Sequence, residues 1–271
     1  MPEKLKFLKR FREFYIPILV LLLIGFAFFT GALWQKVKNL EKGSAGSVTK
    51  TNEPAPSQPT VSLDQIKDLF KKDLIKFGDE NRKVLFVEVS DPSCPYCDIA
   101  SGLNSTLNAQ VNPPQFKLVK DGGTYVAPVS EMRKLVEAGK ASFVWIYFPG
   151  HGNGEMGTKA LYCAYEKGKF WQVHDLLMTD KGYNLLNNTL KNDKTKSGEL
   201  ATFLKSAVDS TFLKECLDSG KYDARLASDT QLAQPLFPPQ GGTPNFFVND
   251  TNFDGAHNYK DMQSAVDAAL K

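Results

Sequence analysis

The chain has 271 residues, 42% of them hydrophobic and 23% charged, and this ordinary globular usage excludes collagen, a wholly disordered chain and a polytopic membrane protein. Lys and Arg number 33 against 30 Asp and Glu, a net charge of +3, which is too balanced for a nucleic-acid-binding protein that relies on neutralising phosphates. Four cysteines are too few for a small disulfide-dense scaffold, so any disulfide here supplements a packed core.

An uncharged apolar run occupies residues 14–34, FYIPILVLLLIGFAFFTGALW. About 20 apolar residues span the roughly 30 Å hydrocarbon core of a bilayer, so we predict a transmembrane helix rather than a buried soluble one. Basic residues concentrate before the run, and the positive-inside rule therefore places residues 1–13 in the cytoplasm and the rest of the chain outside. A cleaved signal peptide is the alternative. Its apolar core is normally about 7–15 residues long and precedes a small-residue cleavage site, so an uncleaved anchor in the cell membrane is favoured.

Residues 35–60 are predicted to be a flexible linker. The stretch 41–60, EKGSAGSVTKTNEPAPSQPT, is rich in Gly, Ser, Thr and Pro and nearly free of large apolar side chains. Such a composition cannot bury a core. We therefore expect one folded domain over residues 61–271.

The hydrophobic pattern of that domain predicts an α/β fold. A helix over 62–77 precedes a buried strand over 83–90, and a turn then opens a helix at about Cys94. The remaining expected elements are, in chain order, a hairpin over 116–127, a helix over 129–139, a strand over 142–148, a largely helical block over 155–236 broken by a polar loop near 180–198, strands over 245–249 and 251–257, and a helix over 259–270. Strand, helix and strand in this order predict a parallel pair joined by a crossover.

The sharpest chemical signal is the motif Cys94-Pro95-Tyr96-Cys97, which follows a buried strand and begins a helix. Unpaired N–H groups and the dipole at a helix start stabilise an anion, so they favour the thiolate form of Cys94, the predicted nucleophile. Cys97 lies one turn further along and suits the role of resolving thiol. Half of a zinc site is the alternative, but zinc usually needs four ligands, and no second pair of residues has metal-ligand spacing. We therefore expect no metal site.

From about residue 80 to 271 the sequence resembles the DsbA-like branch of the thioredoxin superfamily, a group of extracytoplasmic thiol:disulfide oxidoreductases. The resemblance rests on the strand KVLFVEVS, the CPYC motif, a Gly-Thr-Pro before the strand NFFVN, and a helical block that contains LYCAYEKGKFWQVHDLLM. It implies a thioredoxin-like α/β fold with a helical insertion at about residues 150–238, and it implies no dissociable cofactor.

The resemblance also implies roles for residues outside the motif. Glu88 stands where the family places a buried acid that exchanges a proton with the resolving cysteine; a solvent-exposed charge at a strand edge is the alternative. Thr243-Pro244 is expected to form a cis peptide bond facing the CPYC motif and, with Pro95 and Tyr96, to contact a substrate segment that pairs as an added strand. Alone, Gly-Thr-Pro indicates only a turn.

Within the helical block, the resemblance implies a structural disulfide between Cys163 and Cys216, since some relatives carry an extra bridge in this region. A second redox pair is the alternative. Trp171, His174 and Asp175 lie in a stretch similar to the family's W-x-x-H-D, and we expect them to serve helix packing and surface polarity. The other two histidines are also expected to be structural or solvent-facing.

Two stretches depart from the family pattern, residues 111–141 and the Pro-rich approach QPLFPPQGG to Thr243. Asn245 also replaces a commoner Thr. Both regions are expected to border the substrate groove, so the family's substrate preference cannot be transferred to this chain.

Together these features predict a membrane-anchored oxidase that introduces disulfides into exported, cysteine-containing proteins. A membrane reoxidant of the DsbB or vitamin-K-epoxide-reductase type would restore its Cys94–Cys97 disulfide. Two alternatives remain: a reductase or isomerase fed by a membrane electron donor, and a redox-inert peptide-binding chaperone module. The intact CPYC motif argues against the second.

Overall fold

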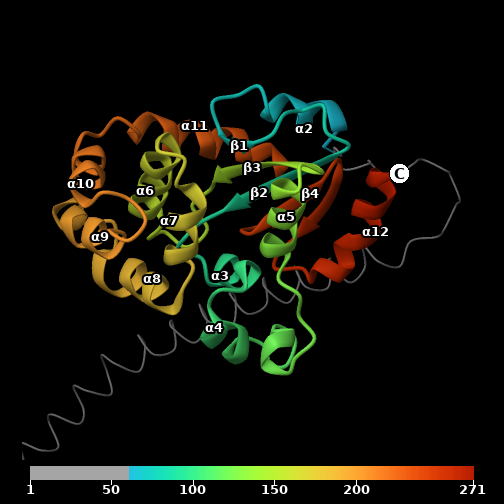
Figure 1. Cartoon of the computed structure of the whole chain (residues 1–271), viewed down its shortest axis with the longest axis horizontal. Helices are drawn as coiled ribbons and strands as arrows, with labels where there is room; N and C mark the ends of the chain where they lie inside the picture. Colours follow the sequence, from blue (N-terminus) through green and yellow to red (C-terminus); the bar gives the residue numbers. More distant parts are fainter. Residues whose placement is uncertain (1–60) are drawn as a thin grey trace, which may run out of the picture. The chain divides into compact units, whose positions relative to one another are not determined.

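A computed structural model describes residues 61–271, in which five strands form one sheet in the order β1-β3-β2-β4-β5 (Figure 1). The strands are β1 (Ile75–Phe77), β2 (Val84–Ser90), β3 (Ala141–Tyr147), β4 (Asn245–Val248) and β5 (Thr251–Asp254). β2 and β3 are parallel, whereas the other neighbouring pairs are antiparallel. The predicted crossover between two parallel strands is confirmed.

Helices cover both faces of the sheet. They are α2 (Leu63–Leu69), α3 (Pro95–Ser101), α4 (Ser105–Gln110), α5 (Pro128–Glu137), α6 (Glu155–Glu166), α7 (Phe170–Leu177), α8 (Asp180–Asn184), α9 (Ser197–Phe203), α10 (Ser210–Asp218), α11 (Asp223–Ala233) and α12 (Tyr259–Leu270). Short 3-10 turns lie at η1 (Val119–Asp121), η3 (Lys194–Lys196) and η4 (Gln234–Leu236), and η2 (Leu185–Leu190) is a π-helix.

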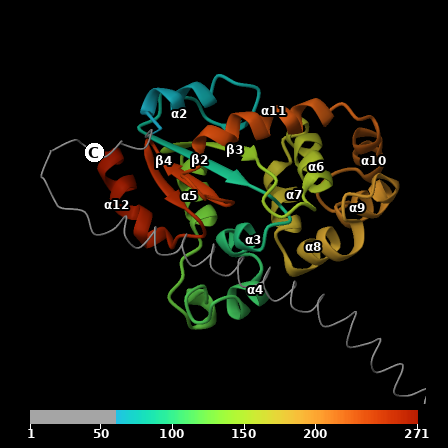
Figure 2. The ribbon, with the colours of Figure 1, turned by 180° about the vertical axis from the view of Figure 1, so that it is seen from behind.

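Side-chain alternation along the central strands builds two cores. Leu85, Val87 and Val89 of β2 face α2 and the end of α11, which lie along the same side of the sheet in both views (Figures 1 and 2). Val84 and Phe86 point the other way, into a larger core with α5, α6, α7 and α12. Because both faces are covered, every residue of β2 and β3 is buried, as expected for continuous apolar runs in parallel strands.

The helical block between β3 and β4 contains α6 to α11, and α6 to α10 gather beyond one end of the sheet (Figure 1). This arrangement confirms a thioredoxin-like α/β fold with a helical insertion. The predicted polar loop near 180–198 was wrong, because α8, η2 and η3 occupy most of it. Leu186 and Leu190 of η2 are buried in the larger core, which explains why this polar stretch is ordered as helical turns.

Two other local predictions were also wrong. The helix expected over 62–77 ends at Leu69, and the apolar residues after it form β1, in which Ile75 pairs with Trp145 at the edge of the sheet. The hairpin expected over 116–127 is instead a loop with η1 and one isolated parallel bridge between Leu118 and Tyr125. Its apolar side chains pack on Ile99 of α3 rather than extending as strands.

The predicted membrane anchor over 14–34, the cytoplasmic segment before it and the linker over 35–60 lie outside the described residues. Within residues 61–271, no helix combines the length and apolar character that crossing a membrane requires.

Candidate active site

Cys94 and Cys97 lie at the start of α3, directly beyond the end of β2. Cys94 is the N-cap residue in extended conformation, and Pro95 is the first helical residue, a position where its missing N–H leaves no hydrogen bond unmade. The Cys94 N–H donates to the Asp91 carbonyl at 2.9 Å, which closes the turn between strand and helix. Both cysteines are free thiols and buried, whereas Tyr96 between them is 39% exposed.

The two thiols have opposite electrostatic environments. A hydrogen bond from Cys97 lowers the pKa of Cys94 to about 7, helped by the Thr243 side chain and by the backbone N–H groups of Tyr96 and Cys97, and against the effect of burial. Burial raises the pKa of Cys97 well above its ordinary value. At neutral pH a substantial fraction of Cys94 is therefore thiolate, the nucleophilic form, while Cys97 stays protonated.

We expect an alkylating agent to modify Cys94 of the fully reduced chain faster than Cys97, with half-maximal Cys94 reactivity near pH 7. Site-resolved mass spectrometry of the full-length chain over a pH series measures both rates together. In Cys97→Ala the hydrogen bond to Cys94 is lost, so the Cys94 midpoint should move toward the ordinary value of about 8.5. Equal rates for the two cysteines would remove the assignment of Cys94 as nucleophile.

The structure brings Thr243-Pro244 next to the motif across 149 residues of sequence. The peptide bond between them is cis, and the Cys94 Sγ donates to the Thr243 carbonyl at 3.3 Å. Pro244 directly precedes β4, the neighbour of β2 in the sheet. Asn245, the first residue of β4, donates through Nδ2 to the Leu236 carbonyl at 3.0 Å, which ties the Pro-rich approach to the strand.

Glu88 lies on β2 in register with Trp145 of β3 and Phe246 of β4, and it is 1% exposed. It is therefore a core residue, and the solvent-exposed alternative was wrong. Burial raises the pKa of the Glu88 carboxyl, while His174 and Ser90 oppose that shift. A carboxyl group in this environment can hold a proton well above the usual pH range of a glutamic acid.

Two carboxyl groups beside the motif, Asp91 and Asp98, are buried and were not predicted as site residues from the sequence. Asp91 accepts four hydrogen bonds, from the N–H and Oγ of Ser93 at 2.8 and 2.7 Å and from the N–H groups of Gly150 and His151, both at 2.9 Å. It thereby joins the loop after β2 to the loop after β3. Asp98 follows Cys97 on α3; burial raises its pKa well above the usual value, and its Oδ1 accepts from Asn104 at 3.1 Å. In the sequence both look like ordinary turn and helix-start acids.

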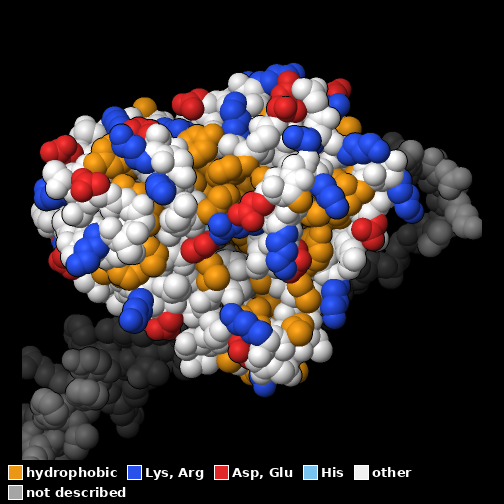
Figure 3. All heavy atoms as spheres, in the orientation of Figure 1, with side chains coloured by type: hydrophobic (Ala, Val, Ile, Leu, Met, Phe, Trp, Pro, Cys, Tyr) orange, Lys and Arg blue, Asp and Glu red, His pale blue; other side chains and the backbone are white. Residues whose placement is uncertain are grey.

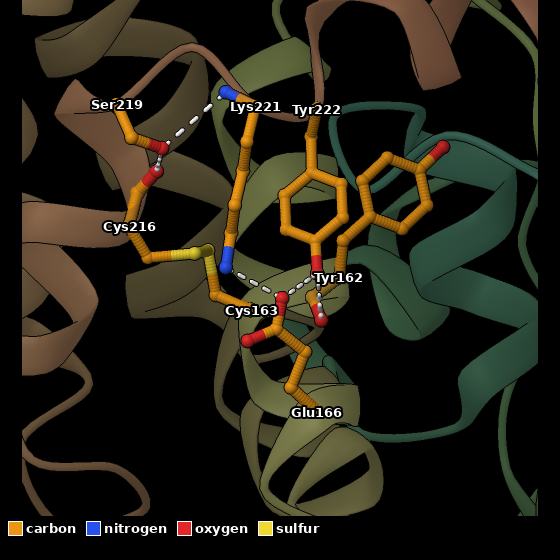
Figure 4. The surroundings of a disulfide bond; sticks show 7 residues. All are labelled: Tyr162, Cys163, Glu166, Cys216, Ser219, Lys221 and Tyr222. Atoms are coloured by element: carbon orange, nitrogen blue, oxygen red, sulfur yellow. Dashed lines mark hydrogen bonds and ion pairs between the residues drawn. A yellow bond between two sulfur atoms is a disulfide. The ribbon is translucent and has the colours of Figure 1, made fainter.

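The other cysteine pair lies away from this site. A disulfide joins Cys163 of α6 to Cys216 of α10, with the two Cα atoms 6.2 Å apart (Figure 4). Next to it the Lys221 Nζ donates to the Glu166 carboxylate at 2.6 Å, and the Tyr222 hydroxyl donates to the same carboxylate. Both half-cystines are buried in the larger core, a position that suits a structural bridge.

Acidic, basic and metal-ligating side chains are dispersed over the described residues. Among residues 61–271, no three His, Cys, Asp or Glu residues are grouped so as to hold a metal ion. On the face seen in Figure 3, Lys and Arg side chains alternate with Asp and Glu, and no extended basic patch forms there.

The model of a family described as thioredoxin matches residues 129–268, more than half of the chain. The chain belongs to the thioredoxin family. A Rickettsia bellii protein named as a protein-disulfide oxidoreductase is 22% identical over 219 residues, covering 81% of this chain and 73% of that one.

Another relative is larger. The Na(+)/H(+) antiporter NhaA 3 of Salinispora tropica is 26% identical over 197 residues, which cover 71% of this chain and 24% of the antiporter. The chain therefore aligns with about a quarter of that protein's length.

Solved structures share the fold. Wolbachia pipientis α-DsbA1 superimposes with a TM-score of 0.52 at 16% identity, covering 73% of this chain and 91% of that one. Oxidised BdbD of Bacillus subtilis gives a TM-score of 0.50 at 20% identity, covering 73% and 92%. The predicted membership of the thioredoxin superfamily is confirmed by the family match, and the two solved structures show that the chain shares the fold of DsbA-like proteins.

Proposed function

We propose that this thioredoxin-family chain is a membrane-anchored, extracytoplasmic oxidase that introduces disulfide bonds into exported proteins through Cys94 and Cys97. One observation carries the thiol chemistry: the pKa of Cys94 is lowered to about 7 while that of Cys97 is raised by burial. Such a pair separates an attacking sulfur from a resolving one. This asymmetry argues against a redox-inert chaperone module.

The exchange proceeds in two steps. A client thiolate attacks the Cys94 Sγ of the Cys94–Cys97 disulfide; that S–S bond breaks, a mixed disulfide forms, and Cys97 leaves with the electron pair and takes up a proton. The second client thiolate then attacks the client sulfur of the mixed disulfide and releases Cys94 as a thiolate. The client has lost two electrons and gained a disulfide, and the enzyme holds two reduced cysteines.

Residues around the sulfurs support these steps. Glu88, which is buried on β2, is the proposed partner for the Cys97 proton, since burial raises the pKa of its carboxyl group and so favours proton exchange there. The exposed Tyr96 ring, Pro95 and the Thr243-Pro244 backbone are proposed to border the client segment, because Thr243 already contacts the Cys94 sulfur. An extended client segment would pair with the backbone there as an added strand.

The proposed location rests on the sequence. Residues 14–34 form the proposed single-pass anchor with the N-terminus in the cytoplasm, and residues 35–60 form the linker to the catalytic domain. A membrane reoxidant of the DsbB or vitamin-K-epoxide-reductase type would accept the two electrons from Cys94 and Cys97. Clients are exported proteins with paired cysteines.

A reductase or isomerase is the second candidate function, and one observation supports it. A Cys94 pKa of about 7 is close to that of a reducing thioredoxin and above the roughly 3.5 of a strongly oxidising enzyme. Less thiolate stabilisation makes the disulfide a weaker oxidant. The direction of electron flow therefore requires a measurement of the relative stability of the two redox forms.

If the chain is an oxidase, its form with reduced Cys94 and Cys97 should melt above the oxidised form. The folded pKa of Cys94, about 7, lies below the unfolded value of about 8.5, so this group adds about 2 kcal/mol of stability above pH 8.5. The contribution is lost as the pH falls through 7. For a domain of this size, each kcal/mol shifts the melting temperature by roughly 2–4 °C.

The test melts the full-length chain in mild detergent at about pH 9 and about pH 6, in both redox states, with Cys163–Cys216 left intact. The same preparation is incubated with a reduced, unfolded client. The reduced form should melt higher at the alkaline pH, the difference should shrink in acid, and the client should gain disulfides. A higher melting temperature for the oxidised form, without transfer to the client, would instead support the reductase.

A further inference from the structure

Asp91 is hydrogen-bonded through its backbone to both cysteines of the motif. Its N–H donates to the Cys97 Sγ at 3.4 Å, and its carbonyl accepts from the Cys94 N–H at 2.9 Å. Asp91 and Cys97 are both fully buried, so bulk water does not compete for the hydrogen bond to the sulfur. The Asp91 N–H is therefore a fixed donor to the resolving sulfur.

The side chain of Asp91 holds this residue in place through four hydrogen bonds. The Oδ1 accepts from the N–H and the Oγ of Ser93, and the Oδ2 accepts from the N–H groups of Gly150 and His151. An ionised carboxylate offers about four acceptor sites on its two oxygens, and all of them are used here. The amide of an asparagine has a single oxygen, so at this position its NH₂ group would face one of the two pairs of donors.

The loop over residues 149–154, which supplies two of these donors, is itself fixed. The Asn153 N–H donates to the Ser93 Oγ at 3.2 Å, and the Asn153 Nδ2 donates to the Asn187 Oδ1 at 3.1 Å. Asn187, on η2, in turn donates to the Ser93 carbonyl at 3.0 Å. These bonds return to the turn after β2, so Asp91 is held against a support that has its own anchors.

The same loop packs against the segment that contains the cis peptide bond. A side chain at Gly150 would collide with the Thr243 Oγ1, so the backbone of the loop lies directly on this residue. The Thr243 carbonyl accepts from the Cys94 Sγ at 3.3 Å. Asp91 therefore links the segment that carries both cysteines with the segment that faces them.

We propose that Asp91 is a positioning residue for thiol–disulfide exchange: its carboxylate, held by the four hydrogen bonds, keeps its own N–H directed at the Cys97 sulfur. This inference rests on the proposed function and deepens it. When a thiolate attacks the Cys94 Sγ, the S–S bond breaks and the Cys97 sulfur leaves with the electron pair. The Asp91 N–H donates to the charge that develops on this sulfur until the sulfur takes up a proton, as preorganised donors do for other leaving or attacking groups.

The same contact acts when Cys97 is the attacking group. A hydrogen bond to the charged form of a group favours that form, and the bond from the Asp91 N–H opposes the rise that burial causes in the pKa of Cys97. In the resolving step the Cys97 thiolate attacks the Cys94 sulfur of the mixed disulfide, and the client sulfur leaves with the electron pair. Both directions of exchange therefore use the Asp91 N–H.

The test compares a step in which Cys97 leaves with a step that involves Cys94 alone. In the first, dithiothreitol reduces the Cys94–Cys97 disulfide of the full-length chain in mild detergent; one of its thiolates attacks Cys94, and its second thiol then closes a cyclic disulfide and releases Cys94. Samples are alkylated at set times and the labels on the two cysteines are counted by site-resolved mass spectrometry. In the second step, Cys94 of the Cys97→Ala chain is alkylated with iodoacetamide. Both steps are followed at about pH 10, above the ordinary thiol pKa, so that Cys94 is ionised in every variant.

Asp91→Asn is the test variant, and Asp193→Asn is its matched control. The Asp193 Oδ1 accepts from the N–H and the Oγ1 of Thr195 at 3.0 and 2.7 Å, which is the same local turn that Asp91 forms with Ser93. Asp193 is exposed, however, and its Oδ2 accepts no hydrogen bond from the described residues. The control therefore changes the same local turn without the contacts that hold Asp91 from the second side.

If Asp91 positions the donor, Asp91→Asn opens the disulfide on the order of tenfold more slowly than the wild type, since a hydrogen bond to a developing charge is lost. Removing the negative charge alone would speed the attack of an anionic thiolate, so slower opening reports the lost positioning. The alkylation rate of Cys94 in the Cys97→Ala background should change by less than about twofold on adding Asp91→Asn, because no sulfur is present there to receive the N–H. Asp193→Asn should keep both rates.

Three outcomes would contradict the inference or its basis. An unchanged opening rate in Asp91→Asn would overturn the positioning role. Equal slowing of disulfide opening and of Cys94 alkylation would also overturn it, because Asp91 would then support the fold around Cys94 rather than the Cys97 sulfur. A wild-type chain whose Cys94–Cys97 disulfide is not opened by the dithiol would overturn the proposed function itself.

A second variant keeps the test valid if Asp91→Asn fails to fold. Ser93→Ala removes one donor to the Asp91 Oδ1 and leaves the contacts with Gly150 and His151. Disulfide opening should slow roughly threefold, again without a change in the alkylation rate of Cys94 in the background that lacks the resolving sulfur. An opening rate equal to that of the wild type would contradict the inference.

Discussion

Replacing Cys94 by serine should abolish thiol–disulfide exchange, whereas replacing Cys97 by alanine should leave a chain that accumulates mixed disulfides with its clients. The Cys94 sulfur is the one whose pKa is lowered to about 7, and it contacts the Thr243 carbonyl beside the proposed client segment. Without it no client sulfur can be attached to the enzyme. Without Cys97 the mixed disulfide still forms from a client disulfide, but no thiol of the enzyme can resolve it.

The two variants are each other's matched control, since each removes one sulfur from the same helical turn. Each full-length variant is incubated with a disulfide-containing client, and thiol-blocked products are separated without reductant. A covalent adduct that disappears on reduction is expected for Cys97→Ala and not for Cys94→Ser. An adduct on Cys94→Ser of equal yield would assign the nucleophile to Cys97 instead.

Two kinds of element were predictable from the sequence: strands that are covered on both faces, and helices that pack through one apolar stripe. β2 and β3 are continuous apolar runs because both faces are covered, and α12 keeps one apolar stripe against the sheet. The error at residues 62–77 has a physical cause: Leu74 and Ile75 continue the helical spacing of α2, yet Ile75 is in a strand paired with β3, and Leu74 packs in the core beside α2. Periodicity records which residues are apolar and not which neighbour covers them.

The site was predictable where the chemistry is local. The CPYC motif carries its own helix start, and Thr243-Pro244 carries a recognisable turn signal. Asp91 could not be identified, because its role depends on backbone N–H groups 59 and 60 residues away. His174 was expected to serve packing, and its ring is indeed buried against Phe170 and Trp171.

Removing the Cys163–Cys216 disulfide should destabilise the chain while leaving exchange at Cys94 largely intact. The bridge closes a loop of 53 residues between α6 and α10. In the chain-entropy model such a loop contributes up to roughly 4 kcal/mol, often less in practice. The Lys221–Glu166 ion pair beside the bridge is partly exposed. Such a pair contributes only about 0–1 kcal/mol, so it does little to hold α6 and α10 together without the disulfide.

The double variant Cys163→Ala/Cys216→Ala is therefore expected to melt at most roughly 8–16 °C below the wild type, at 2–4 °C for each kcal/mol. Both single variants leave an unpaired thiol, so the double variant is the one to compare. Thermal melting of the full-length chain gives the stability. Reaction of the reduced Cys94 with an aromatic disulfide that releases a coloured thionitrobenzoate anion, followed at about 25 °C, gives the exchange rate of the still-folded protein. An unchanged melting temperature together with lost exchange would show that these two cysteines relay electrons. A disulfide that only restricts the unfolded chain would not change the reactivity of the Cys94 sulfur.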